Sequence, residues 1–132
     1  MAYLLETDQV IDLLEGVPEA VSLAEQLRAT GTSMSLISYM EAYAGALRRG
    51  KVQALDELTL EVPVLPFSAE TARRCAELRN ALARAGKRVR PRSLDLMTAA
   101  TALEHRLTLV TRNTSDFDDI PGLDLYRWPE PA

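Results

Sequence analysis

The sequence predicts an α/β domain in which a mostly parallel, twisted sheet is covered by helices on both faces, in three layers. Short apolar or β-branched runs, such as Tyr3–Leu5 and Leu107–Thr111, alternate with segments that carry apolar residues at helical spacing. Strands that alternate with helices are joined by right-handed crossovers, which make neighbouring strands parallel. The chain has 132 residues, of which 47% are hydrophobic and 26% charged, so we expect one domain over residues 1–132.

The first half of the chain contains a strand, two helices, a second strand and a third helix. The second strand is expected at Ser33–Ile37, where it turns directly into the third helix. The three helices are bounded by caps and breakers: Val10 to Gly16, Pro18 to Gly31, and Ser35 or Ser38 to Gly50.

The second half repeats this alternation. In chain order we expect a helical piece around Val52–Leu58, an apolar run at Val62–Leu65, a long helix from Ser68 to Ala85, an alanine-rich helix at Leu94–Glu104, the strand Leu107–Thr111 and a short strand near Leu123–Tyr126.

Composition narrows the possible function classes. The net charge of −4 lacks the basic footprint of a general nucleic-acid binder, although a basic run, Lys87–Arg92, precedes the alanine-rich helix. The single cysteine, Cys75, forms no intramolecular disulfide and offers no zinc cluster. No window approaches the ~20 apolar residues of a membrane helix. The first sixteen residues carry four acids where a signal peptide needs basic residues, so we expect a cytoplasmic protein without a membrane partner.

Acidic residues fall where a parallel sheet binds its ligands, at the carboxyl ends of the strands. Glu6 and Asp8 follow the first strand, Asp95 begins the alanine-rich helix, and Asp116 lies in the loop after Leu107–Thr111. Glu41 lies on a helix instead. Its spacing places it on an apolar stripe formed by Ile37, Met40, Ala44 and Leu47.

These acids predict a cation site. A carboxylate on an apolar face is costly unless a charge or hydrogen bonds compensate it, and here the expected neighbours are themselves anionic. Converging carboxylates without His or Cys suit Mg²⁺ or Mn²⁺ and disfavour zinc. The single histidine, His105, is expected to face solvent near a helix C-terminus.

Four segments together give the chain a resemblance to PIN domains, and specifically to the VapC toxins of bacterial VapBC toxin–antitoxin pairs. The resemblance covers nearly the whole chain and rests on Tyr3–Asp8 (YLLETD), Ser38–Glu41 (SYME), Asp95–Ala102 (DLMTAATA) and Leu107–Phe117 (LTLVTRNTSDF). It implies a Mg²⁺-dependent endoribonuclease, often a homodimer. It also implies that a cognate VapB-type antitoxin neutralises the nuclease by inserting part of its chain into the acidic groove.

The resemblance also assigns roles to residues. It implies that Glu41, Asp95 and Asp116 are acids of the metal site. Glu6 departs from the family, which has aspartate there, usually as the central metal ligand. The longer side chain leaves open an active natural variant, a weakened one, or a deliberate substitution. Asp8 is a candidate to share the ligation.

A phosphodiester is an anion, so an all-carboxylate pocket needs divalent ions before it can accept one. We therefore expect Glu6, Asp8, Asp95 and Asp116 to bind metal, and Glu41 to act as a ligand or to orient water. Supporting or substrate-binding candidates are Thr7, Ser38, Thr111, Arg112 and Asn113. The Arg112 guanidinium would hold either a carboxylate or, as we favour, a substrate phosphate.

The basic run Lys87–Arg92 would approach the RNA backbone or remain a solvated loop. Tyr39, Tyr43 and Trp128 form no obvious base-stacking platform.

Two other classes of protein compare with this pattern of acids. A phosphoacceptor receiver domain would need a lysine after a late strand, where this chain has Arg112. A PIN-like module with catalysis lost through Glu6 would act by binding RNA or antitoxin.

Overall fold

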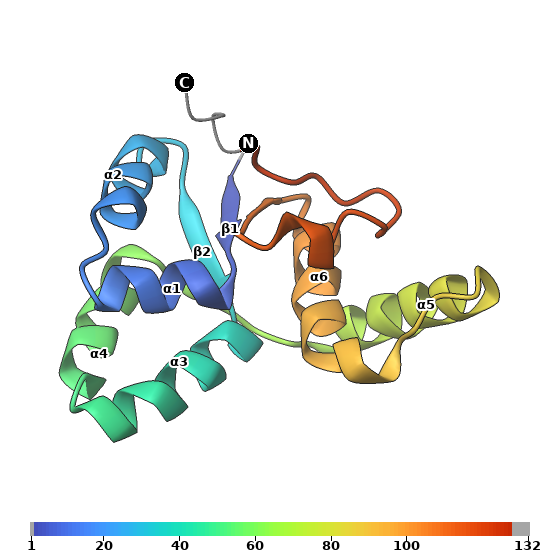
Figure 1. Ribbon diagram of the computed structural model, residues 1–132, viewed down its shortest axis with the longest axis horizontal. Helices are drawn as coiled ribbons and strands as arrows, with labels where there is room; N and C mark the ends of the chain where they lie inside the picture. Colours follow the sequence, from blue (N-terminus) through green and yellow to red (C-terminus); the bar gives the residue numbers. More distant parts are fainter. Residues whose placement is uncertain (1, 128–132) are drawn as a thin grey trace.

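The computed structural model describes residues 2–127 and contains, within them, a four-stranded sheet in the order β3–β2–β1–β4 (Figure 1). The strands are β1 (Tyr3–Leu5), β2 (Thr32–Ser35), β3 (Val64–Leu65) and β4 (Thr108–Val110). Every pairing is parallel, as predicted. Because β1 lies between β2 and β4, the residues that follow β1 emerge in the middle of the carboxyl edge.

Helices cover both faces of the sheet, which confirms the three-layer α/β arrangement. Figure 1 shows the first four helices on one side of the sheet and the last two on the other. The six are α1 (Thr7–Leu14), α2 (Pro18–Leu27), α3 (Leu36–Arg49), α4 (Val52–Glu61), α5 (Ala69–Arg84) and α6 (Ser93–His105). Two short 3-10 helices, η1 (Arg90–Arg92) and η2 (Thr114–Asp116), flank α6 and β4.

Alternation along the strands separates two hydrophobic cores. Leu4 and Leu109 face α5 and α6, whereas Leu5 and Val110 face the first four helices, and all four are buried. Successive side chains of a strand point to opposite faces, so adjacent apolar residues in β1 and β4 contribute one to each core.

Capping residues set the helix ends that hold the site. Ser35 caps α3 by accepting a hydrogen bond from the Ser38 amide at 3.0 Å, and Gly50 ends that helix with φ 68°. Ser35 is therefore the cap, and Ser38 lies inside the first turn. At α5, Ser68 and Thr71 form a capping box, and the buried Thr71 hydroxyl donates to the Glu104 carboxylate on α6.

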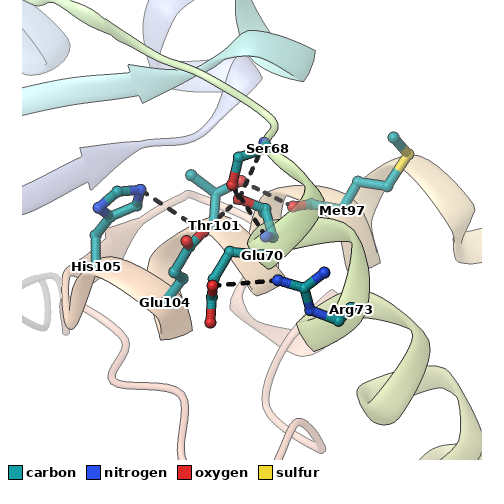
Figure 2. Close-up of polar contacts among 8 residues, drawn as sticks. Ser68, Glu70, Arg73, Met97, Thr101, Glu104 and His105 are labelled. Carbon is teal, nitrogen blue, oxygen red and sulfur yellow. Dashed lines mark hydrogen bonds and ion pairs between the residues drawn. The ribbon is translucent and has the colours of Figure 1, made fainter.

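This contact fixes the far end of α6. Figure 2 shows Ser68, the N-cap residue of α5, together with Glu104 and His105 of α6. His105 Nε2 lies 3.7 Å from Glu104, and the His105 side chain is 37% exposed at the C-terminal end of the helix. The hydrogen bond from Thr71 to Glu104 anchors the C-terminal end of α6 against α5, and Asp95 lies at the other end of α6.

Four sequence-based expectations need correction or fall outside the described part. The helix α1 begins at Thr7 rather than at Val10, because Glu6 caps it. The expected strand near Leu123–Tyr126 is reduced to a single parallel bridge between Leu125 and Leu109. The apolar run before α5 forms only the two-residue strand β3. Trp128 lies outside the described residues.

The prediction that an apolar stripe of α3 is buried was wrong for most of its residues. Ile37 is buried, but Met40 and Leu47 are 50% and 63% exposed, and Ala44 is exposed too. The buried face of α3 is instead formed by small residues, including Ala42 and Ala46, that let the helix approach α1. Glu41 therefore lies at the margin of the buried face.

Candidate active site

The start of α1 brings two acids to the centre of the carboxyl edge. Glu6 has extended backbone geometry, and its carboxylate accepts a hydrogen bond from the Asp8 amide at 3.2 Å. An acidic N-cap also complements the helix dipole. Glu6 is 7% exposed, so this capping role holds its carboxylate inside the protein.

Thr7 joins α1 to α3. Its hydroxyl donates to Glu41 Oε1 at 2.7 Å, and it lies 3.0 Å from the Ser38 hydroxyl. Ser38 is buried and lies 3.2 Å from Ser35, whose hydroxyl is 3.2 Å from that of Thr98 on α6. A line of hydroxyl groups thus crosses the site from α1 to α6 and orients Glu41.

Asp8 organises the loop after β4. Its Oδ2 accepts hydrogen bonds from the Thr111 hydroxyl at 3.1 Å, the Arg112 amide at 2.8 Å and the Asn113 side chain at 3.3 Å. Its Oδ1 is buried and has no hydrogen-bond partner in the described structure. Three of the predicted supporting residues therefore position Asp8, and leave one of its oxygens for another ligand.

Arg92 positions the second half of the site. Its guanidinium donates to both carboxylate oxygens of Asp119, at 2.9 and 2.7 Å, and to the Asp116 carbonyl at 2.9 Å. The bidentate pair lowers the pKa of Asp119. Arg92 immediately precedes α6, so this contact places η2 with Asp116 beside the first turn of α6 with Asp95.

The charges that act on Asp95 identify the acids that lie near it. Burial raises the pKa of Asp95, and the negative charges of Asp116, Glu41 and Asp8 raise it further, against the opposing charge of Arg92. Carboxylates from four separate segments therefore share one region. The three acids assigned by the resemblance, Glu41, Asp95 and Asp116, lie in one electrostatic neighbourhood rather than on separate surfaces.

Glu6 differs from this group. Burial raises its pKa to about 7, and the charge of Asp8 is the next largest cause. Its carboxylate is engaged at the N-terminus of α1, so the structure brings Glu6 next to Asp8.

Arg112 holds a carboxylate, the first of the two alternatives considered. Its guanidinium donates to both oxygens of Asp12, at 2.8 and 3.3 Å. The Asp12 side chain is only 15% exposed. Sequence reasoning missed both this pair and the Arg92–Asp119 pair. The four-residue spacing of Asp8 and Asp12 was the available signal for the first pair.

The donor chemistry of this region fits a hard divalent cation. Its oxygens come from carboxylates and hydroxyls, one buried Asp8 oxygen lacks a partner, and like charges penalise ionised Asp95. As the side chains stand, however, no group of three or more His, Cys, Asp or Glu residues within residues 2–127 is arranged to hold a metal ion. Ligation would therefore require the carboxylates to draw together.

We expect the metal-free chain to lose stability as the pH rises from 4.5 to about 7 because of Glu6. Its pKa is raised from 4.5 to about 7, so within this window the folded chain holds a proton that the unfolded chain has released. The contribution is complete below pH 4.5 and is lost as the pH passes 7. Since a tenfold change in proton affinity is worth about 1.4 kcal/mol, Glu6 accounts for roughly 3 kcal/mol.

Urea unfolding in EDTA between pH 4.5 and 8 measures this effect. Glu6→Gln removes the titrating group and should flatten the profile in that window. An unchanged slope in Glu6→Gln would show that other groups cause the pH dependence.

Residues 3–123 match the model of the PIN domain family. The chain belongs to the PIN domain family. This confirms the resemblance drawn from the four sequence segments.

Two curated relatives extend the comparison along nearly the whole PIN domain. The tRNA(fMet)-specific endonuclease VapC of Shigella flexneri is 26% identical, covering 97% of this chain and 98% of the relative. Ribonuclease VapC2 of Rickettsia felis is 28% identical with the same coverage. The solved complex of VapBC2 from Rickettsia felis with a promoter DNA fragment contains a chain with TM-score 0.86 and 27% identity. The alignment covers 98% of this PIN domain and all of that chain.

Within residues 2–127 of this PIN domain, no helix is both long and apolar enough to cross a membrane.

Proposed function

We propose that this chain is a Mg²⁺-dependent endoribonuclease and the toxin of a VapBC-type toxin–antitoxin pair. The observation that carries the proposal is the electrostatic coupling of Asp95 to Asp116, Glu41 and Asp8 at the carboxyl edge of a parallel sheet. Its relatives include proteins named as VapC endonucleases, which supports the same activity.

The residues divide into metal-binding and positioning groups. Asp8, Asp95 and Asp116, with Glu6, would hold Mg²⁺ or Mn²⁺. A bound divalent ion supplies positive potential for the phosphodiester, lowers the pKa of a coordinated water and stabilises charge at the reacting phosphate. Glu41, held by the Thr7 hydroxyl, would accept a proton from the attacking water or orient it.

The surrounding contacts keep these groups in place. Thr111, Arg112 and Asn113 hold Asp8 through hydrogen bonds, and Arg92 holds the backbone of Asp116. Such partners of ligands tune metal binding by orienting the carboxylates. The exposed cations of the basic run, including Arg88 and Arg90, would contact the RNA backbone.

The similar solved structures also support the choice of protein partners. Several similar solved structures are toxin–antitoxin complexes, which supports a VapB-type antitoxin as partner. A homodimer is supported by the exposed apolar residues of α3, among them Leu36 at 43%, Met40 at 50% and Leu47 at 63%. We place the activity in the cytoplasm, where RNA is available.

A second candidate is a PIN-like module that binds RNA or antitoxin with little catalysis. It is favoured by one observation: the carboxylate of Glu6, at a position where the resemblance implies aspartate, is used to cap α1. The two functions differ in metal-dependent turnover.

Cleavage of an RNA panel that includes tRNA tests the proposed function. With Mg²⁺ we expect discrete products, and EDTA should abolish them. Millimolar Mg²⁺ should also raise the melting temperature by several degrees, since a ligand at 100 times its Kd stabilises the fold by about 2.7 kcal/mol. Asp95→Asn should lose most of this shift.

Two results would contradict the proposed function. Cleavage that persists in EDTA would overturn metal dependence. Absence of cleavage in both the native chain and Glu6→Asp would favour the binding module.

A further inference from the structure

A narrow groove between α1 and α3 begins at Glu41 and leads away from the acidic cluster. Two side-chain contacts join the helices along it, Thr7 to Glu41 at one end and Glu15 to Arg49 at the other. In both contacts the partners are 34 residues apart, so the two helices run in the same direction (Figure 1). From the first contact to the second a helix rises about 12 Å, which gives the length of this α1–α3 groove.

The far end of the α1–α3 groove carries an excess of positive charge. Arg48, Arg49 and Lys51 line it there, together with one acid, Glu15, which pairs with Arg49. The ion pairs formed within residues 2–127 include neither Arg48 nor Lys51. Two cations at this end are therefore not neutralised by a carboxylate of the described chain.

Arg48 keeps most of its hydrogen-bond donors available. Its Nη1 donates to the Ala44 carbonyl of its own helix at 3.3 Å, and the side chain is exposed. A guanidinium offers five N–H donors in a planar fork. The remaining donors of Arg48 can therefore bind an acceptor that enters the groove.

Gly45 leaves space beside this guanidinium. Glu41, Gly45 and Arg48 follow at four- and three-residue spacing, so they lie on one face of α3. Glycine inside a helix is less stable than alanine. Packing does not require it here, because a β-carbon at Gly45 would make an ordinary contact of 3.9 Å with Arg48 Nη2. The missing side chain keeps the groove open between Glu41 and Arg48.

The volume of the groove suits one small group of a longer ligand. It measures about 80 Å³, whereas pockets that enclose a whole small molecule measure about 300–1,000 Å³. A water molecule takes about 30 Å³, so the space admits a compact group but not a nucleoside. Guanidinium groups bind phosphate through paired N–H donors. A phosphodiester is the compact anion that recurs along an RNA strand.

We propose that the α1–α3 groove binds an RNA phosphate that flanks the cleaved linkage, with the Arg48 guanidinium donating to its oxygens. The inference rests on the proposed ribonuclease function and adds the path by which the strand leaves the acidic cluster. From Glu41 to Arg48 the helix rises about 10 Å, so the bound phosphate is a neighbour of the reacting one. Arg48 is a substrate-binding residue in this scheme and takes no part in the metal site.

The apolar side of α3 remains available for a second copy of the chain. Leu36, Met40 and Leu47 lie roughly a quarter of a turn or more around the helix from Glu41 and Arg48. The proposed homodimer and the proposed RNA strand therefore use different sides of α3.

A double-mutant cycle between the protein and its substrate tests the contact. RNA substrates are prepared in which one phosphate at a time, on either side of the cleaved linkage, is replaced by an uncharged methylphosphonate. In the native chain, one of these replacements should lower kcat/KM about tenfold. In Arg48→Gln, kcat/KM for the unmodified RNA should already be about tenfold lower, and the same replacement should cost little more.

Binding measurements give a readout that does not depend on cleavage. Fluorescence anisotropy of the same RNAs in Ca²⁺, which is also a hard, oxygen-bound cation, should show the same coupling. Loss of one phosphate contact should reduce the slope of log Kd against log salt by about 0.7 in Arg48→Gln. Arg74→Gln removes the same charge from an exposed position of α5 and should change neither the coupling nor the slope.

The outcomes separate this inference from the proposed function. If the losses from Arg48→Gln and from every methylphosphonate simply multiply, the phosphate groove is overturned and the nuclease stands. A lower melting temperature with an unchanged salt slope would assign Arg48 to the C-terminal dipole of α3 and would also overturn it. Coupling in the binding measurement without any RNA cleavage would support the groove and count against the nuclease.

Discussion

Replacing Asp95 with asparagine is expected to slow RNA cleavage by at least about 100-fold while it stabilises the metal-free fold. Mutation of a residue that merely supports a metal ligand typically costs 10–100-fold, so loss of a ligand should cost more. The stabilisation has a separate cause. The pKa of Asp95 is raised by burial and by the charges of Asp116 and Glu41, so the ionised form is unfavourable in the folded chain.

Initial cleavage rates at saturating Mg²⁺ and melting temperatures in EDTA measure the two effects. Asp118→Asn is the matched control, because Asp118 is an exposed acid in the same loop as Asp116. It should leave the rate within about twofold. An Asp95→Asn protein that cleaves at the native rate would remove Asp95 from the active site.

Shortening Glu6 to aspartate is expected to raise the cleavage rate by up to about 100-fold. Displacement of a catalytic group by about 1 Å can cost that much, and the extra methylene of Glu6 produces a displacement of this order. The fold should tolerate the change, because aspartate is itself a favoured N-cap and can retain the hydrogen bond from the Asp8 amide.

The same Mg²⁺-dependent assay compares Glu6→Asp with Glu57→Asp, which makes the identical change at an exposed position of α4. Only Glu6→Asp should gain activity. A rate that falls in Glu6→Asp would show that the longer side chain is the productive one in this protein.

Local patterns were sufficient for most of the fold. The amphipathic segments and their caps depend on neighbouring residues, so the sequence predicted α3 up to Gly50 and α5 from Ser68. The errors occur where a tertiary contact overrides the local pattern. Glu6 extends α1 by one turn, and the fold turns the Met40 and Leu47 side of α3 away from the sheet.

The sequence alone determined the alternation of strands and helices and the kind of site, because apolar periodicity and residue type are local properties. It therefore predicted carboxylates at the carboxyl edge of a parallel sheet. Only the tertiary structure decided which groups meet, since partners far apart in the chain become neighbours through packing. It paired Arg112 with Asp12 and set the Asp95 charge against those of Asp116 and Glu41.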